Sequence, residues 1–494
     1  MYTKRLPRWA ALASACLFAA GLATAQAPQA NEGAAKPAAD APDLTSKLDA
    51  YLQAAVRNEQ FSGSVLVARE GKPLFDRSYG MASIEFDVPN TSATIFRIAS
   101  LTKQFTAMAI LQLQERGKLK VGDPVCRYLA DCPASWQPIT LRHLLTHTSG
   151  IRNVSSLPDW DENLGLKRYR HADFVDLFRG LPLEFTPGEK YTYSNSGYYL
   201  LGLVIERASG KPYAQYLQEA IFTPLQMRHT AYTENREIVA GRASGYYSRG
   251  AQIVAAPYID PTTTYAAGGI TSTTGDLLRW DQALYTDKLA SRRSRDEMFT
   301  PFKEGYAYGW RVGEKFGRHT AEHSGSLNGF SSYILRFPDQ WATVIVLGNG
   351  DRMSAGKTGK NLAAILFGEP CAMPKPALRD VLWNTVVGKG AMAAIGQYRE
   401  LRRTQADEYD FGADTLVDLG YDLFSDLRLE EAAAIFEFSL ETFPKSAYSY
   451  DGLADIALER GDRSKAIAWF EKSLALDLAN EYASLGLERA KRGR

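Results

Sequence analysis

Two groups of strand-like runs stand far apart in the sequence, and this separation constrains the fold more than any other feature. The runs cover residues 64–68, 74–79, 308–312, 320–323, 330–337 and 342–347. Turns and short helices fill the stretch between the groups, and longer helices are expected at 44–58 and 356–367. Because strands need partners, the pattern predicts a mixed α/β domain, with an antiparallel sheet flanked by the terminal helices, a helical subdomain and a cleft between them.

The first residues have the features of a processing signal. Basic residues start the chain, residues 10–22 are mainly apolar, and an Ala-Thr-Ala cleavage site ends at residue 25. The sequence therefore predicts a signal peptide at 1–25, export to the periplasm or the medium, and no transmembrane segment in the mature chain. Residues 26–43, rich in alanine and proline, are predicted to be a flexible linker.

The composition gives no sign of a charged partner. The 494 residues carry a formal net charge of +1, so neither nucleic acid nor a membrane surface is a predicted partner. Three cysteines remain after cleavage at residue 25, and in an oxidising compartment Cys126 and Cys132 could form a small-loop disulfide or stay as two buried thiols. No cysteine and histidine cluster has the spacing of a metal site, and neither a metal nor another cofactor is predicted.

The C-terminal part repeats. Residues 413–446 and 447–480 align at a 34-residue offset, which pairs Leu419 with Leu453, Ala432 with Ala466 and Phe436 with Phe470. This period and pattern resemble the tetratricopeptide repeat, in which pairs of antiparallel helices stack. The predicted parts after the linker are a main domain, a connecting helical segment and an all-α repeat tail, at 44–370, 371–412 and 413–494. A generic helical bundle is the alternative for the tail, which is expected to bind a protein or peptide, pack on the main domain or self-associate.

The tetrapeptide Ser100-Leu101-Thr102-Lys103 lies where a strand-rich stretch gives way to an apolar helix. A serine three residues before a lysine shares its helix face, so Lys103 could take the proton of the Ser100 hydroxyl and make it a nucleophile. Apolar flanking residues would desolvate Lys103 and favour its neutral form. The alternatives are a helix N-cap for Ser100 and a solvated surface charge for Lys103.

A second motif, Tyr193-Ser194-Asn195, follows a Thr-Pro-Gly turn. A loop tyrosine near Lys103 could pass a proton between the nucleophile and the leaving group, and Asn195 could bind a substrate carbonyl. Considered alone, Tyr193 is more typical of a packing residue.

A third motif, His323-Ser324-Gly325, falls on a predicted strand. Gly325 would let a substrate lie against the backbone, and the N–H of Ser326 would join that of Ser100 as an oxyanion donor. His323 would add a polar or cationic contact, although an isolated histidine is more often structural.

In this order, S-x-x-K, Y-x-N and H-x-G resemble the motifs of the penicillin-recognising serine hydrolases, which include β-lactamases, D-alanyl-D-alanine carboxypeptidases, esterases and D-amino-acid peptidases. The strings at 96–100 and 142–150 are similar to the class C β-lactamase type, and the resemblance covers about 44–368. It implies that Ser100 is the acylated nucleophile and that Lys103 and Tyr193 transfer protons. Asn195 and His323 would bind substrate.

One departure from the family bears on the substrate. Class C β-lactamases carry lysine where His323 stands, and a histidine that is often neutral suits a substrate carboxylate less well. The expected function is therefore an exported serine hydrolase acting on a small peptide, amide or ester, as a D-stereospecific peptidase, amidase or esterase. A true β-lactamase is the first alternative, and a catalytically idle binding or scaffold protein that uses the repeat tail is the second.

Two other strings are interpreted as coincidental. Lys357-Thr358-Gly359 spells the third motif with lysine, but it is expected at the start of the last helix. Residues 319–323 match the H-x-x-E-H zinc pattern, which needs a helix; on a strand, residues four apart are separated by roughly 13 Å.

Overall fold

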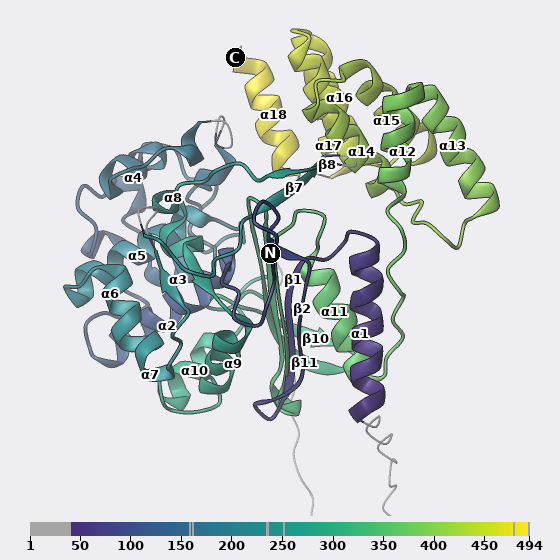
Figure 1. Ribbon diagram of the computed structural model, residues 1–494. Coiled ribbons are helices and arrows are strands. Elements are labelled where there is room, and N and C mark those ends of the chain that lie inside the picture. Colours follow the sequence, from purple (N-terminus) through teal and green to yellow (C-terminus); the bar gives the residue numbers. More distant parts are fainter. Residues whose placement is uncertain are drawn as a thin grey trace, which may run out of the picture. The chain divides into compact units, whose positions relative to one another are not determined.

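A six-stranded antiparallel sheet forms the centre of the main domain in a computed structural model (Figure 1). Its strand order is β10 (Arg311–Lys315), β11 (Arg318–Leu327), β12 (Phe330–Phe337), β13 (Ala342–Gly348), β1 (Gly63–Arg69) and β2 (Lys72–Tyr79). The structure describes residues 41–494 apart from 158–159, 161–162, 234–236, 250–251, 478–479 and 493–494.

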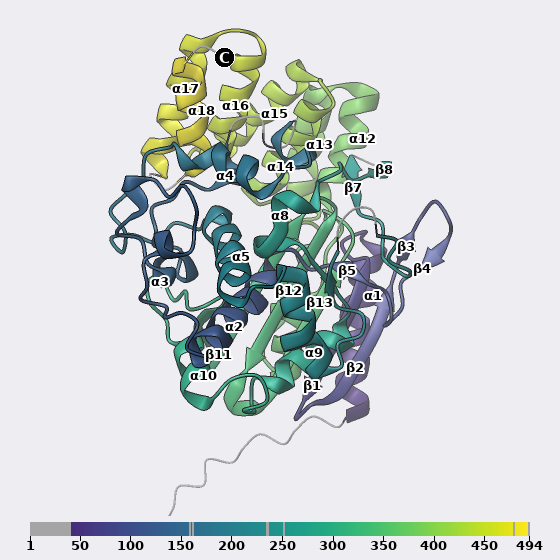
Figure 2. The ribbon, with the colours of Figure 1, turned by 90° about the vertical axis from the view of Figure 1, so that its left-hand side faces the viewer.

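Helices cover both faces of this sheet. α1 (Ala41–Arg57) and α11 (Ala355–Phe367) lie on one face, and the helices of the middle segment lie on the other (Figures 1 and 2). Alternate strand residues point to opposite faces, so Val65 and Val67 join the core under α1 and α11 whereas Leu66 joins the core of the helical part.

The two ends of the main domain meet in the middle of the sheet. β1 pairs with β13 in a register that sets Val65 opposite Val346. Every residue of β13 is buried, because strands flank it on both sides and helices cover both faces. The sheet is therefore continuous only when the N-terminal hairpin β1–β2 has joined the C-terminal strands.

The helical part lies between the two groups of strands in the sequence. Its α-helices are α2 (Thr102–Glu115), α3 (Leu141–Leu145), α4 (His171–Arg179), α5 (Asn195–Ser209), α6 (Tyr213–Leu217), α7 (Thr223–Leu225), α8 (Pro261–Gly268), α9 (Thr274–Ala283) and α10 (Arg292–Phe299). There are also three small sheets among the described residues. The first pairs β3 (Met81–Ser83) with β4 (Val88–Pro89), and the second pairs β7 (Tyr246–Arg249) with β8 (Gln252–Ala255). In the third, β9 (Ile270–Ser272) lies between β5 (Phe96–Arg97) and β6 (Ala231–Tyr232). Helix α2 packs against α5 and α8 and is buried along most of its length.

The predicted fold class is confirmed, with one strand displaced. The run 330–337 is β12 as predicted, but the run 308–312 is not a strand over that range. β10 begins at Arg311 because a tight turn at Phe316-Gly317, both with positive φ, sets the register of its pairing with β11. Tyr308 and Trp310 are buried in the preceding loop, and this burial rather than strand formation explains their apolar pattern.

The C-terminal part is entirely helical over its described residues. Its helices are α12 (Leu378–Lys389), α13 (Ala391–Thr404), α14 (Ala413–Ser425), α15 (Leu429–Thr442), α16 (Ala447–Glu459), α17 (Arg463–Leu476) and α18 (Glu481–Arg492). Helices α16 and α17 each begin and end 34 residues after α14 and α15, the period found in the sequence. Phe436 packs between Gly420 and Gly452, where an added Cβ would meet its ring at 2.5 and 2.3 Å. Small residues therefore let the helix pairs approach closely.

The N-terminal predictions fall largely outside the described residues. This holds for the signal peptide at 1–25 and for the linker up to residue 40. Residues 41–43, expected in the linker, instead open α1, since a proline and then an acidic residue in the first turn suit a helix N-terminus. Across the described part of the chain, no helix is both long and apolar enough to cross a membrane.

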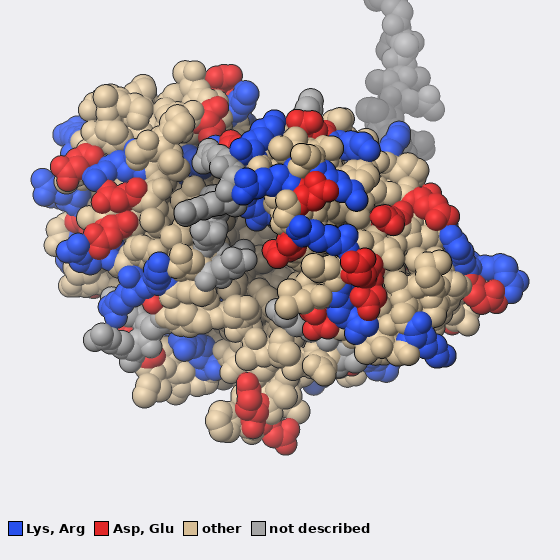
Figure 3. Space-filling view, turned by 90° about the horizontal axis from the view of Figure 1, so that it is seen from above, with Lys and Arg blue, Asp and Glu red and all other residues tan. Residues whose placement is uncertain are grey.

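Two smaller features complete the description. Cys126 and Cys132 are joined in a disulfide, and Cys371 is a free thiol. Acidic and basic side chains are interspersed over the face seen in Figure 3, in keeping with the net charge of +1.

Candidate active site

Ser100 lies in a short 3₁₀ turn, Ala99–Leu101, that leads directly into α2. The residue before it, Ala99, has a φ of +46°, a conformation that costs a non-glycine residue about 1 kcal/mol or more. Ser100 is not the N-cap of α2, because that position belongs to Leu101. The turn instead leaves Ser100 on the wall of a cavity, one turn before Lys103.

Lys103 is completely buried and has three polar neighbours. Its Nζ lies 3.1 Å from Ser100 Oγ, 2.8 Å from Asn195 Oδ1 and 2.8 Å from the carbonyl oxygen of Ala267. None of these partners is charged, and the Tyr193 ring, 4.7 Å from Nζ at its centroid, closes another side. Burial therefore lowers the pKa of Lys103 well below its usual value, which favours the neutral amine.

Asn195 is held at three points. Its side-chain oxygen accepts from Lys103, its Nδ2 donates to Ser155 Oγ at 2.9 Å, and its backbone N–H donates to Asn153 Oδ1 at 3.0 Å. Asn195 begins α5, so the loop that contains Asn153 and Ser155 fixes the start of that helix against Lys103.

Tyr193 is packed against a histidine that the motif search did not select. The ring centroids of His147 and Tyr193 are 4.2 Å apart, and His147 Nδ1 accepts the backbone N–H of Ser194 at 3.1 Å. Burial, with a smaller contribution from Lys103, lowers the pKa of His147 well below its usual value. Desolvation raises the pKa of Tyr193, although an interaction with the Ser100 hydroxyl opposes this shift.

His323 is buried and electrically neutral. Its Nδ1 donates to the Ser324 carbonyl oxygen at 2.6 Å, so its Nε2, 2.9 Å away from the Tyr306 hydroxyl, accepts that hydroxyl proton. Burial, followed by the nearby Lys103, lowers the pKa of His323 to about 3. The cationic contact considered from the sequence is therefore absent at neutral pH, and the polar contact remains.

β11 passes directly beside the nucleophile. A Cβ added to Gly325 would lie 2.6 Å from the carbonyl oxygen of Ile98 and 3.0 Å from the backbone nitrogen of Ser100. Ser332 on β12 donates to the same Ile98 carbonyl at 2.8 Å and fixes this approach from the neighbouring strand. Ser326 follows on β11, and both it and Ser100 line the cavity.

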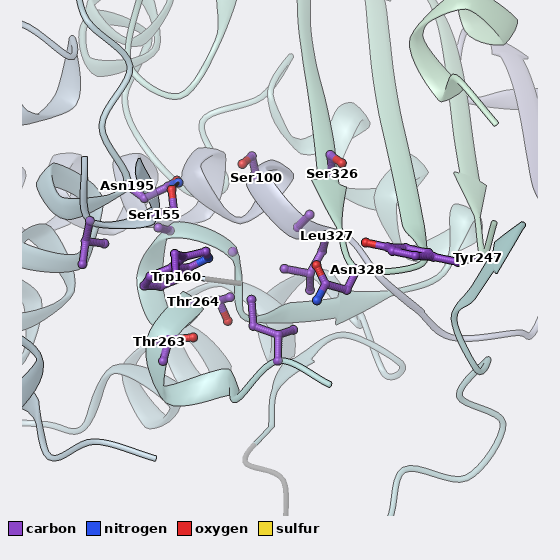
Figure 4. Close-up of a pocket in the computed structure, with 15 residues that line it drawn as sticks. Ser100, Ser155, Trp160, Asn195, Tyr247, Thr263, Thr264, Ser326, Leu327 and Asn328 are labelled. Atoms are coloured by element: carbon purple, nitrogen blue, oxygen red, sulfur yellow. Dashed lines mark hydrogen bonds between the residues drawn. The ribbon is translucent and has the colours of Figure 1, made fainter. Parts of the chain in front are cut away.

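The cavity has a volume of about 200 Å³ and opens between the helical part and the edge of β11. Figure 4 shows Ser100 between Ser326 on one side and Asn195 and Ser155 on the other, with Trp160, Thr263 and Thr264 across the cavity. The described side chains of its wall are uncharged: Ala99, Ser100, Val154, Ser155, Trp160, Asn195, Tyr247, Ile259, Thr263, Thr264, Ala267, Ser326, Leu327 and Asn328. Lys103, Tyr193 and His323 do not line this cavity.

Three residues of the site were not selected from the sequence. His147 lies within one of the strings that carry the resemblance, so its position in that string was the available signal. Ser155 and Tyr306 occur in no motif that we identified, and only their tertiary contacts with Asn195 and His323 mark them.

The two strings interpreted as coincidental lie away from the nucleophile or in the wrong geometry. Lys357 is in the first turn of α11, whose N-cap is Ser354. His319 and His323 both lie on β11, and no group of three or more metal-ligating side chains occurs among the residues that the structure describes.

The antiparallel sheet, the buried Lys103 beside Ser100 and the order of the three motifs are features of the penicillin-recognising serine hydrolases. A family model described as Beta-lactamase matches residues 48–367. The chain therefore belongs to the beta-lactamase family, and the predicted family is confirmed.

Similar proteins agree with this assignment. Penicillin-binding protein 4* of Bacillus subtilis (strain 168) is 34% identical over 363 residues, which cover 67% of this chain and 79% of the relative. The crystal structure of a penicillin-binding protein from Bacillus halodurans matches with a TM-score of 0.55 and 28% identity, covering 63% of this chain and 94% of that one. A D-stereospecific amidohydrolase from Streptomyces sp. matches with a TM-score of 0.56 and 25% identity, covering 65% and 98%.

Proposed function

We propose that this chain is an exported serine hydrolase that forms an acyl-enzyme on Ser100 and acts on an amide, peptide or ester, with D-stereospecificity. It needs no metal or other cofactor in this proposal.

The hydrogen bonds of Lys103 carry the proposal. A neutral amine has two N–H groups and one lone pair, and the two carbonyl oxygens of Asn195 and Ala267 can only accept. The third neighbour, the Ser100 hydroxyl, is then the group that can donate into the lone pair. Once Lys103 has taken the proton, its third N–H can turn toward Ser100 without any change in the other two bonds. The same cage thus accommodates both states of a general base.

The remaining residues supply the other steps of acyl transfer. The N–H groups of Ser100 and Ser326 would stabilise the oxyanion of the tetrahedral intermediate, since Gly325 keeps β11 close to Ser100. Tyr193, whose ring centroid lies 4.7 Å from Lys103 Nζ and whose hydroxyl interacts with Ser100, would return the proton to the leaving group. Asn195 would bind the substrate carbonyl through the Nδ2 hydrogen that is not donated to Ser155.

The neutral state of His323 favours an amide, peptide or ester over a β-lactam. A β-lactam antibiotic carries a carboxylate, and a neutral His323 offers it no charge at the position where class C β-lactamases carry lysine. The D-stereospecific amidohydrolase among the similar structures supports the same direction.

The test is an intact-mass measurement after incubation with a penicillin and, separately, with activated D-amino-acid amides and esters. We expect wild type to gain the mass of an acyl group or to turn over an amide or ester, and Ser100→Ala to do neither. Full turnover by Ser100→Ala would disprove the assigned nucleophile. Rapid loss of penicillin would instead favour the β-lactamase alternative, and no reaction with any probe would favour an idle scaffold.

The proposal extends to the organisation of the whole chain. It places a signal peptide at 1–25 and a linker after it, the hydrolase domain at 44–370, a connecting segment at 371–412, and tetratricopeptide-like repeats at 413–494 that bind a protein or peptide. The mass of the exported protein would test the first point, because cleavage after Ala25 fixes its N-terminus.

A further inference from the structure

Two arginines lie next to each other behind the wall of the active-site cavity. Arg97 is on β5, three residues before Ser100, and Thr271 of β9 is opposite it in the small sheet. Arg242 follows in a bridge with Ile95, two residues before Arg97 in the sequence. Arg242 is close enough to act on Arg97, whose pKa is lowered first by burial and then by Arg242.

Neither guanidinium has a hydrogen bond or an ion pair with any residue that the structure describes. Asp260 is the carboxylate whose charge acts on Arg97. Its oxygens accept hydrogen bonds from the Tyr258 hydroxyl and from the N–H and hydroxyl of Thr262. Burial and the adjacent Arg242 outweigh the favourable charge of Asp260 at Arg97, so the two neighbouring cations form an unfavourable arrangement. A bound anion would remove this cost.

The space between the arginines is small, with a volume of about 10 Å³. It is a narrow cleft lined by Arg97, Arg242, Thr233, Pro261, Thr264, Gly268, Gly269 and Thr271, so three hydroxyl groups surround the two guanidiniums. Thr264 and Gly268 also line the active-site cavity, where Figure 4 shows Thr264 opposite Ser100. The cleft and the cavity therefore share a wall.

We propose that Arg97 and Arg242 form a binding site for an oxyanion, a carboxylate or a phosphate, adjoining the active-site cavity. Arginine presents paired N–H donors that match the two oxygens of such a group. The Thr233 hydroxyl can supply a further donor, whereas the hydroxyls of Thr264 and Thr271 donate to the Pro261 and Ala231 carbonyls. The ligand is either a small free anion or the anionic group of a substrate whose reacting carbonyl lies at Ser100. The second case rests on the proposed function, whereas the site itself does not.

Binding of the anion is measured first, on the whole protein and without any reaction. Calorimetric titrations with sodium phosphate and with sodium acetate, at constant ionic strength, are carried out on wild type, Arg242→Gln, Arg97→Gln and the control Arg293→Gln on the exposed side of α10. We expect saturable binding of at least one anion to wild type and to Arg293→Gln. In Arg97→Gln and Arg242→Gln the dissociation constant should rise at least tenfold, because about one hydrogen bond between charged groups is lost. No binding to wild type, or equal binding to Arg242→Gln, would overturn the proposal. Arg242 is partly exposed, so that variant decides the matter if Arg97→Gln does not fold.

A pair of esters then distinguishes the two sources of the anion. The esters share one leaving group and differ only in a carboxylate at the end of the acyl chain. A higher kcat/KM for the carboxylate ester, lost in Arg242→Gln, would assign the site to the substrate. Equal rates, together with binding in the titration, would assign it to a free anion. If neither ester reacts, the proposed function is in question, and the titration alone still decides whether the oxyanion site exists.

Discussion

Lys103 is surrounded by uncharged groups, so burial rather than a charged partner sets its affinity for a proton. Below its lowered pKa, Lys103 is protonated and cannot accept the proton of Ser100. The rate of acylation should therefore rise with pH through that pKa and then stay level. His323, with a pKa of about 3, remains neutral over the whole range, and the raised pKa of Tyr193 adds no descending limb near neutral pH.

The substitution Asn195→Asp tests this view of Lys103. It would set a carboxylate where an amide oxygen now lies 2.8 Å from Nζ, and an opposite charge at that distance favours the protonated amine. We expect the ascending limb of kcat/KM to move to higher pH by roughly one to three units. The pH profile is the readout, because a lower rate without a moved limb would mean only that substrate binding was damaged.

Gly325 is a second position at which a single added atom should change the rate of acylation. In Gly325→Ala the new Cβ would meet Ser332 Oγ at 2.3 Å and the Ile98 carbonyl oxygen at 2.6 Å, so β11 must move away from Ser100. We expect acylation to slow by about 10²-fold, as a displacement of about 1 Å at a reacting group can cause. Gly313→Ala on β10 is the control, since nothing lies within 4 Å of its added Cβ. Equal rates for the two variants would contradict this account of β11.

The contacts of these residues show what the sequence could predict about the site. The spacing of the two residues predicted that Ser100 lies beside Lys103, and their hydrogen bond agrees with this. The resemblance added Tyr193, Asn195 and His323. Asn195 contacts the Lys103 amine, and the rings of Tyr193 and His323 lie near each other. His147 and Tyr306 could not be found in this way, because their roles in the site depend on packing between segments that are distant in the sequence. The neutral state of His323 is likewise a product of burial.

At the level of elements, an ion pair joins the sheet to the helical part. Arg336 on β12 and Asp281 on α9 are 2% and 1% exposed, and the guanidinium also lies against the rings of Tyr285, Phe299 and Trp310. The pair spans the boundary between β12 and the helices that support the active site. It therefore bears on the stability of the whole main domain.

Removal of one partner should be costly, because the other charge stays buried without a counterion. We expect Arg336→Met to lower the free energy of unfolding by about 3–5 kcal/mol. The exposed pair of Arg292 with Asp296 provides the control, and Arg292→Met should change stability by less than about 1 kcal/mol. Urea unfolding of both variants is the measurement. Similar midpoints for the two variants would show that the buried ion pair stabilises the protein no more than the exposed pair does.

The elements themselves were largely predictable because their periodicity is strong. The expected helix at 356–367 and the expected strand at 342–347 each differ from α11 and β13 by a single residue at one end. The strand expected at 308–312 was displaced for a physical reason, since alternating aromatic residues mark burial and a buried loop can satisfy the same pattern as a strand. The start of α1 differed because helix-initiating residues occur inside an otherwise linker-like composition.

On the scale of the whole molecule, the main domain and the C-terminal helices have separate hydrophobic cores. The two cores of the main domain use residues up to 371, and the two cores of the tail use residues from 378 onward. The structure from Bacillus halodurans matches over 94% of its own length while covering 63% of this chain, so a relative can build the domain without a counterpart of the tail. We therefore expect each part to fold by itself.

Deletion of residues 371–494 should leave a folded hydrolase. We expect the truncated chain to be acylated at Ser100 as fast as the full chain, because the residues around Lys103 all belong to the main domain. Calorimetry of the full chain should show more than one unfolding transition, of which the truncated chain keeps only the part due to the main domain. An insoluble or unreactive truncated protein would mean that the tail supports the domain.

The pairing of β1 with β13 governs when the enzyme can first become active. As the chain emerges from the ribosome, β1 appears early and its partner β13 is made only after almost the whole main domain. Gly325, which lies against Ser100, emerges only shortly before that partner. A chain that lacks β13 therefore has a nucleophile but no assembled site, so the site can form only after residue 348 has been synthesised.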